Sequence, residues 1–373
     1  MNEVRALVEA FDAANLGGER CALATVVSVE GSSYRRPGAR MLVCEEGTTT
    51  GTISAGCLES DVIEHAKRVI WKGEAKLVEY DTASTSDEMV WGLGLGCGGI
   101  VRVLVEPLAP GSLYVEALRR SGAGPVTVAT VYQSEFAPTG ARLVLDDEGN
   151  VSHEKLDDGM AAMLESEVRA PSRGGMTSIK IFIETLLPPV PLVVFGAGQD
   201  ALPIVELARG LGWHTEVVDP QARPASRSRF AMADKVTLSR PEDVGRHVTV
   251  TPRTMTLLMS HNYVHDLAFL RFLLASPARY IGVMGPRDRT ERMLKELAAN
   301  GVDLARLHSP VGLDIGANSP SEIALSIVAE MRAVLEGRRG GMLRERQGSI
   351  HGSPEDGEHV TAAEERVLRV VAA

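Results

Sequence analysis

Two cysteines lie in surroundings that suit a bound ligand or metal. Cys97 is flanked by Gly96 and Gly98 in the run Gly94–Gly99, where few side chains surround the thiol and a bulky ligand can approach the sulfur. Cys57 directly precedes a segment with helical spacing, and a helix N-terminus favours the thiolate. Thiolates bind soft metals such as molybdenum and carry transferable sulfur. Both cysteines are therefore candidate cofactor ligands, and the alternative for each is a small, inert core residue.

The other cysteines are expected to be structural. Cys21 and Cys44 fall in apolar segments typical of buried strands, where a thiol packs as a small hydrophobic group. The chain has four cysteines and no C-x-x-C pair, which argues against a structural zinc site. Disulfides are not expected in a reducing cytosol.

A polar loop between two predicted strands carries groups that bind phosphate. The segment 31–38 offers the hydroxyls of Ser32 and Ser33 beside the guanidinium of Arg35. Guanidinium groups bind phosphate through paired donors. The alternative is an exposed turn, because glycine, serine and proline are also ordinary turn residues.

The segment 191–201 has the pattern of a nucleotide-binding turn. An apolar strand precedes Gly196-Ala-Gly198-Gln-Asp-Ala201, which opens a predicted helix. Glycines let the backbone approach a pyrophosphate, and the helix N-terminus supplies amide donors. Asp219 ends the next strand, where a carboxylate can accept a ribose hydroxyl. These residues predict a Rossmann-type site for a nucleotide such as NAD(P). The alternatives are a vestigial or repurposed cleft, with Asp219 as a simple turn residue.

Two further loops follow predicted strands of the same region. His261 lies in the loop 260–266, and Arg287 and Arg289 follow Gly285. The carboxyl ends of parallel strands meet at one edge of a sheet, where ligands bind. His261 can contact a phosphate or act as an acid or base. The loops together favour an anionic ligand, although ordinary loop polarity also explains His261.

Composition excludes several classes of protein. The chain has 373 residues, a formal net charge of -10 and 4% aromatic residues, which argues against generic nucleic-acid binding. The first sixteen residues carry charges among the apolar ones, unlike a signal peptide. No apolar run approaches the roughly 20 residues that span a membrane. We therefore expect a cytoplasmic protein that binds neither nucleic acid nor membrane.

The elements that position these residues predict an α/β protein. An N-terminal α+β domain is followed, after the proline-rich connector 186–191, by alternating strands and helices typical of a doubly wound parallel sheet. The expected tail is polar and flexible, with a short helix at 361–371. The predicted segments are an N-terminal domain at 1–110, a middle α+β segment at 111–187, a Rossmann-like domain at 190–336 and a tail at 337–373.

An internal repeat is visible in the first half. Residues 20–108 and 125–187 share short strand motifs, including Gly-Ala-Arg at 38–40 and at 140–142. The same offset aligns Cys57 with Gly159, and the offset of the closing strands aligns Cys97 with Gly175. Shared strand composition is the alternative explanation. If both copies have one fold, these thiols are not needed to form it.

The chain resembles the XdhC/CoxI family of accessory factors for xanthine and carbon monoxide dehydrogenases. The resemblance rests on Gly56-Cys57-Leu-Glu59, on Gly96-Cys97-Gly-Gly99 and on the segment 312–330, and it covers about 20–108 and 190–332. Departures are Ala201 at the third glycine of the nucleotide turn and Pro-Arg-Asp-Arg after Gly285.

The resemblance implies a carrier rather than an enzyme. Its expected cargo is the molybdenum cofactor, as molybdopterin or its nucleotide form, which the family binds, protects and delivers to the large subunit of an apo molybdenum hydroxylase after sulfuration by a cysteine desulfurase. By position in the motifs, Cys97 is the first candidate for the cofactor cysteine and for molybdenum contact, and Cys57 is the second. A homo-oligomer is also expected. The alternatives are an NAD(P)-dependent oxidoreductase and a regulatory nucleotide-binding protein.

Overall fold

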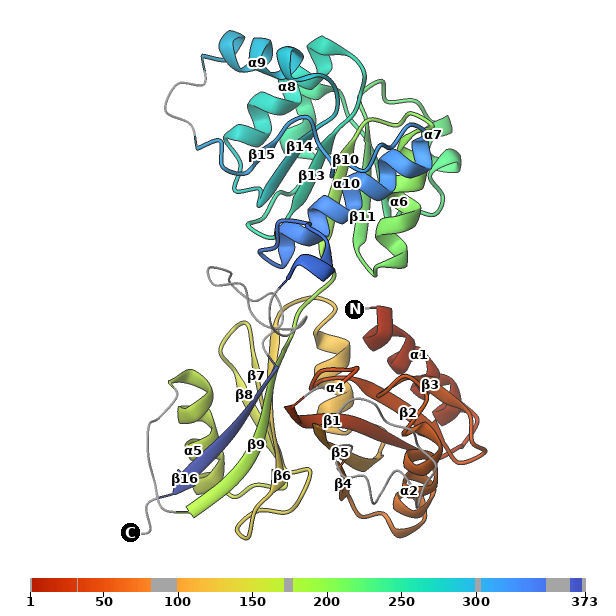
Figure 1. Cartoon of the computed structure of the whole chain (residues 1–373), viewed down its shortest axis with the longest axis vertical. Helices are drawn as coiled ribbons and strands as arrows, with labels where there is room; N and C mark the ends of the chain where they lie inside the picture. Colours follow the sequence, from red (N-terminus) through yellow and green to blue (C-terminus); the bar gives the residue numbers. More distant parts are fainter. Residues whose placement is uncertain are drawn as a thin grey trace. The chain divides into compact units, whose positions relative to one another are not determined.

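The computed structural model describes residues 2–31, 33–81, 99–170, 177–298, 303–346 and 363–370. The chain forms two compact units (Figure 1). The amino-terminal unit comprises Glu3–Pro188 together with Thr361–Ala373, and the carboxy-terminal unit comprises Pro189–Val360 together with Met1–Asn2. The middle segment and the end of the chain therefore belong with the first segment.

The first half of the amino-terminal unit is a five-stranded antiparallel sheet in the order β3-β2-β1-β5-β4. The central strand β1 is buried along most of its length, because helix α2 packs on one face of the sheet and a second sheet lies against the other. The elements in chain order are α1 (Asn2–Leu16), β1 (Cys21–Gly31), β2 (Arg40–Cys44), β3 (Thr49–Gly51), α2 (Glu59–Lys72), β4 (Lys76–Asp81) and β5 (Gly99–Leu108).

The second half repeats this sheet in the order β8-β7-β6-β9-β16. The strand β16 pairs antiparallel with β9, in the position that β4 has beside β5 (Figure 1). The added elements are α4 (Leu113–Arg120), β6 (Val126–Gln133), β7 (Arg142–Asp146), β8 (Val151–Glu154), α5 (Asp158–Arg169), β9 (Thr177–Leu186) and β16 (Ala363–Val370).

The end of the chain corrects a prediction from the sequence. We expected a short helix at 361–371 within a flexible tail, and the structure has the strand β16 at Ala363–Val370. The physical reason is tertiary. Strand β16 occupies the β4 position beside β9 and pairs with an edge whose backbone groups would otherwise lack partners.

The repeat extends to single hydrogen bonds. In the first copy the Val26 amide donates to the Ala39 carbonyl (2.9 Å) and the Gly38 amide to the Val26 carbonyl (2.8 Å). In the second copy Val131 donates to Ala141 and Gly140 to Val131, both at 2.8 Å. The strands β1 and β6 also both shift register directly after these valines. The sequence repeat therefore coincides with a structural repeat.

The two sheets face each other through matched residues. Val27 and Leu104 of the first copy pack against Tyr132 and Phe182 of the second. Beside them two buried ion pairs cross between the copies: Arg40 with Glu184, and Arg142 with Glu106. The arginines follow the two Gly-Ala motifs, and each glutamate lies two residues before the end of its closing strand, β5 or β9. The contact is thus reciprocal, as in an interface between two copies of one chain.

A buried tyrosine links the crossed ion pairs. The Tyr114 hydroxyl on α4 accepts from Arg40 Nε at 2.7 Å and donates to Glu184 at 2.8 Å. The Arg142 guanidinium lies 4.6 Å from the centre of its ring. Buried charges cost desolvation energy unless they are paired and hydrogen-bonded, and this network meets that requirement.

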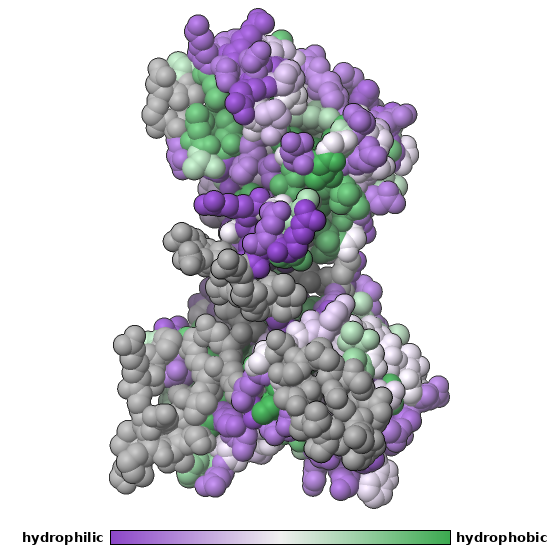
Figure 2. Space-filling model, viewed as in Figure 1, coloured by the Kyte–Doolittle hydropathy of each residue, from purple (hydrophilic) through white to green (hydrophobic). Residues whose placement is uncertain are grey.

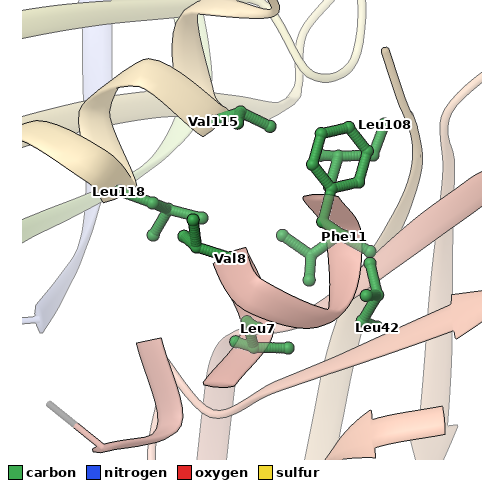
Figure 3. Close-up of a pocket in the computed structure, with 8 residues that line it drawn as sticks. Leu7, Val8, Phe11, Leu42, Leu108, Val115 and Leu118 are labelled. Carbon is green, nitrogen blue, oxygen red and sulfur yellow. The ribbon is translucent and has the colours of Figure 1, made fainter. Parts of the chain in front are cut away.

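A small apolar cavity lies between α1 and α4 (Figure 3). Its volume is about 10 Å³, the space of a single water molecule, and it has no polar lining. It is a packing gap rather than a ligand site. Its lining consists of Leu7, Val8, Phe11, Leu23, Leu42, Leu108, Val115 and Leu118.

The carboxy-terminal unit confirms the predicted doubly wound fold. Its six strands are all parallel, in the order β12-β11-β10-β13-β14-β15. The elements are β10 (Pro191–Phe195), α6 (Ala201–Gly210), β11 (His214–Asp219), α7 (Ala225–Arg229), β12 (Lys235–Leu238), the 3₁₀ helix η1 (Pro241–Arg246), β13 (Met255–Leu258), α8 (Tyr263–Leu274), β14 (Tyr280–Val283), α9 (Arg287–Glu296), β15 (Leu307–His308), α10 (Pro320–Leu335) and the 3₁₀ helix η2 (Leu343–Glu345).

Helices cover both faces of this sheet. The helices α6 and α10 pack on one face and α8 and α9 on the other. The helix α10 begins with the predicted capping box, in which Ser319 and Glu322 each bond the other's backbone amide. Figure 2 shows a hydrophobic area over α6 and α10. Leu207 of α6, Leu211 directly after it and Leu325 of α10 are exposed. Among the described residues no helix is long and apolar enough to span a membrane.

Candidate functional site

The loop that carries Cys57 is held by its own polar side chains. Glu59, at the start of α2, accepts from the Thr52 hydroxyl (2.6 Å) and from the Ser54 amide (2.9 Å). Burial raises the pKa of Glu59, but these bonds and that of the Ser54 hydroxyl outweigh it, so the pKa is lowered overall. Gly56 has a φ of 105°, which favours glycine. The loop is therefore a preformed turn with an ionised carboxylate.

Cys57 itself is a half-buried free thiol. Its side chain packs against the core beneath α2, and it lies two residues before the helix begins at Glu59. The Cys57 side chain therefore contributes to packing and is only partly exposed.

The structure corrects the repeat alignment at this cysteine. The offset of 102 places Cys57 on Gly159, which lies inside α5. Aligning the starts of α2 and α5 instead pairs Leu58 with Asp157, and therefore Cys57 with Leu156. The connection before α5 is shorter, which shifts the register. Leu156 packs on the core of the second copy as Cys57 does on that of the first, so this position supports packing in both copies.

The serine and arginine loop is tied to helix α1. Arg35 donates to both carboxylate oxygens of Glu3, each at 2.9 Å. A phosphate at this loop would therefore compete with a carboxylate for the guanidinium. Ser33 is half-buried in the same loop, and Ser32 lies outside the described residues.

The predicted site around Cys97 also lies outside the described residues. Residues 82–98 include Gly96, Cys97 and Gly98, and the strand β5 begins at the next residue, Gly99. The candidate role of this thiol stays a prediction, as does its alignment with Gly175, which lies outside the described residues as well.

In the carboxy-terminal unit the glycine turn lies against the end of β13. Gly196 has a φ of 143°, and a Cβ there would lie 2.5 Å from the Met259 carbonyl oxygen. The turn between β10 and α6 therefore requires glycine for the close approach of two backbones. The strands β10 and β13 are neighbours, and their loops diverge to opposite faces of the sheet, which is the usual place of the ligand crevice in this fold.

His261 faces this turn and has a partner that the sequence did not indicate. Its Nε2 lies 2.5 Å from a carboxylate oxygen of Asp200, the residue before α6. The His261 backbone has a φ of 56°, a strained conformation for a residue other than glycine. Asp200 is thus a site residue that we missed, and its place in the glycine turn was the available signal. A Cβ at Gly198 would lie 2.4 Å from this carboxylate.

Asp219 is engaged by its own loop. Its carboxylate is fully buried and accepts from the Ser226 hydroxyl (2.6 Å), the Gln221 amide (3.0 Å) and the Arg223 amide (3.1 Å). Burial raises the pKa of Asp219, but these bonds hold it below its usual value. This geometry matches the alternative of a turn residue at a strand end, because a ribose hydroxyl would have to displace one of these donors.

The arginines of the next loop have different surroundings. Arg289 Nη2 donates to Asp266 at 2.7 Å, and Asp266 also accepts from the Ser260 hydroxyl at 2.6 Å. Arg287, the first residue of α9, is exposed. Arg287 therefore presents positive charge at the sheet edge where Asp200 contributes a negative one.

Each unit offers groups of a different chemical kind. A thiol beside a helix start can bind a soft metal or carry sulfur, whereas a glycine turn with His261 and Arg287 nearby can receive an anion. Among the described residues no group of three or more histidine, cysteine, aspartate or glutamate side chains could hold a metal ion by itself.

Comparisons with known proteins agree with the architecture. The profile of the XdhC and CoxI family matches residues 16–81, and that of the XdhC Rossmann domain matches residues 192–331. A solved structure described as a xanthine dehydrogenase from Bacillus halodurans superposes with a TM-score of 0.76 and 31% sequence identity, covering 92% of this chain and 98% of its own.

Two curated relatives match most of the chain. A probable subunit of xanthine dehydrogenase from Bacillus subtilis is 32% identical over 320 residues, which is 84% of this chain and 92% of the relative. The molybdenum cofactor insertion chaperone PaoD of Escherichia coli is 24% identical over 322 residues, 86% of this chain and 85% of its own. Since both profiles and a near full-length relative match, the chain belongs to the XdhC and CoxI family.

Proposed function

We propose that the protein is an accessory factor of a molybdenum enzyme that binds the molybdenum cofactor as cargo, supports its maturation and inserts it into a xanthine or carbon monoxide dehydrogenase-type hydroxylase. The observation that carries the proposal is the match over most of both chains to a molybdenum cofactor insertion chaperone, within a family that covers both units. The relatives support an accessory role for a molybdenum enzyme. The binding and insertion of the cofactor are proposed in addition.

The thiols of the amino-terminal unit are the proposed contacts to the metal end of the cargo. Cys97 is the first candidate because its glycine surroundings leave room beside the sulfur. Cys57 is the second, because its half-buried side chain also packs on the core. Thiolate chemistry fits a molybdenum centre and a sulfur that a cysteine desulfurase supplies. The proposed partners are the cysteine desulfurase, the apo-hydroxylase and a second copy of this chain.

The crevice of the carboxy-terminal unit is the proposed site for the phosphate or nucleotide end of the cargo. The turn at Gly196 and Gly198 brings backbone amides to the start of α6, and the exposed Arg287 provides positive charge at the same sheet edge. The Asp200 carboxylate, which contacts His261, opposes an anion there. This arrangement favours a ligand held by several modest contacts and able to leave.

A nicotinamide dinucleotide fits this crevice less well. The residue expected to accept its ribose hydroxyl is Asp219, and both of its oxygens are used by the following loop. This use of the Asp219 carboxylate argues against a nicotinamide dinucleotide at this turn.

The test is retention of the cofactor by the full-length protein. The protein is incubated with molybdenum cofactor without oxygen and passed through a gel-filtration column, and bound molybdenum and pterin are measured per protein. We expect near-stoichiometric binding and a clear loss in Gly198→Asp, which adds bulk and negative charge at the turn. Circular dichroism provides the control for folding. Absence of cofactor from the wild type, or nicotinamide binding with hydride transfer, would reject the proposal.

A further inference from the structure

A pair of cysteines outside the proposed cargo site is placed for reversible oxidation. Cys21, the first residue of β1, lies directly opposite Cys44, the last residue of β2. Their sulfur atoms are 3.0 Å apart, and both side chains are buried. Neither thiol has a role in the proposed binding of the cofactor.

The register of the sheet suits a bond between them. Arg20 lies opposite Glu45, one position from the cysteine pair, and the Glu45 amide donates to the Arg20 carbonyl. Val26 lies opposite Ala39, five positions from the pair in the other direction, and the Val26 amide donates to the Ala39 carbonyl. Hydrogen-bonded positions alternate along an antiparallel ladder, so Cys21 and Cys44 occupy a non-hydrogen-bonded position. At such a position the α-carbons lie about 4.5 Å apart, inside the roughly 4.4–6.8 Å range of disulfides.

The second copy of the repeat shows that the fold does not need these thiols. In the equivalent register Val126 lies opposite Asp146, and the sheet there has the same strand order. The second copy thus has an apolar side chain, Val126, and a carboxylate, Asp146, where the first copy has two thiols. The paired thiols are therefore a special feature of the first copy rather than a requirement of its sheet.

We propose that Cys21 and Cys44 form a redox modification site, in which a small peroxide converts the two thiols into a disulfide that ties β1 to β2. The pair lies at the end of the ladder between β1 and β2, where the next residues, Arg20 and Glu45, form an exposed ion pair. The disulfide would close the open end of the hairpin whose connection carries the serine and arginine loop.

The chemistry needs only hydrogen peroxide as oxidant. One sulfur attacks the peroxide, an S–O bond forms, the O–O bond breaks, and a sulfenic acid and water result. The other sulfur then attacks the sulfenic sulfur, an S–S bond forms, and the leaving hydroxide takes the thiol proton to give a second water. The two sulfurs together lose two electrons, and one peroxide becomes two waters. Burial, and then the contact with Cys44, raises the pKa of Cys21, so this oxidation should be slow.

The experiment treats full-length, fully reduced protein with hydrogen peroxide without oxygen. A background of Cys57→Ser with Cys97→Ser removes the other thiols. We expect the intact mass to fall by two hydrogens, a Cys21–Cys44 cross-linked peptide to appear under non-reducing conditions, and the melting temperature to rise by several degrees, because the cross-link restricts the unfolded chain. Dithiothreitol should reverse all three changes.

The control is Cys21→Val, which copies the residue at the equivalent position of the second copy. It should fold and show neither the mass loss nor the rise in melting temperature. If the reduced background protein instead gains oxygen at single cysteines, or links only between two molecules, the proposal is overturned. Because these readouts need no cofactor, they are independent of the proposed carrier function.

Discussion

The two copies in the amino-terminal unit share a fold but differ in their reactive side chains. The strands β1, β2, β3 and β5 correspond to β6, β7, β8 and β9, with the same pairing and the same shift of register. The described cysteines, Cys21, Cys44 and Cys57, all belong to the first copy. The equivalent positions of the second copy hold Val126, Asp146 and Leu156. The difference teaches that the sheet tolerates the loss of the thiols, so their presence in one copy reflects chemistry or local packing rather than the fold.

Breaking the contact between the copies should have the largest effect. Arg142→Met leaves Glu106 buried without its partner, and we expect a loss of about 3–5 kcal/mol in the free energy of unfolding. Chemical denaturation of the variant measures it. The double variant Arg142→Met with Glu106→Leu should recover most of the stability, because no unpaired charge remains. If the single variant is as stable as the wild type, the crossed ion pairs do not hold the copies together.

Removal of β16 tests whether the end of the chain completes the second copy. A chain that stops before Ala363 loses the ladder to β9, and we expect a cost of about 2 kcal/mol, since each ladder hydrogen bond contributes about 0.5–1.5 kcal/mol net and ordering the strand offsets part of it. The effect should fall on the amino-terminal unit alone, which differential scanning calorimetry can resolve. An unchanged melting profile would show that β9 does not need this neighbour.

Substitution of the thiols of the first copy tests whether they bind the cofactor. Cys97→Ser should reduce the affinity for molybdenum cofactor at least about tenfold, equivalent to about 1.4 kcal/mol, because a hydroxyl is a poor ligand for a soft metal. Cys57→Ser should reduce it less, because its side chain also packs on the core. Gel filtration without oxygen, with molybdenum and pterin analysis, measures both.

The matched controls are Cys21→Ser and Cys44→Ser. Each should cost about 1–3 kcal/mol of stability through a buried hydroxyl and leave cofactor affinity unchanged. Equal retention by all four variants would remove the argument for a cysteine anchor.

The smallest expected effect concerns the cavity between α1 and α4. Val8→Ile adds a methylene at its wall and should raise the free energy of unfolding by up to about 1 kcal/mol, because the added group is buried against apolar side chains. The measurement is again chemical denaturation. A loss of stability would indicate that the wall cannot accept the longer side chain without strain.

The sequence alone determined much of this protein because some of its signals are local. The alternation of strands and helices from 191 onward predicted the doubly wound sheet, and Ser319 with Glu322 predicted the capping box at the start of α10. The Gly-Ala-Arg motifs indicated the repeat. Hydrophobic period, turn glycines and capping residues act over a few positions, so they can be recognised without knowledge of distant partners.

Only the tertiary structure decided which distant groups meet. Motif spacing could not show that Arg40 pairs with Glu184 of the other copy, that Asp200 faces His261, or that the loop after Asp219 uses its carboxylate. The final strand was likewise mistaken for a helix, because its local sequence fits either state and the edge of β9 selects the extended one. Contacts between remote segments depend on how the elements pack, and local sequence patterns do not predict that packing.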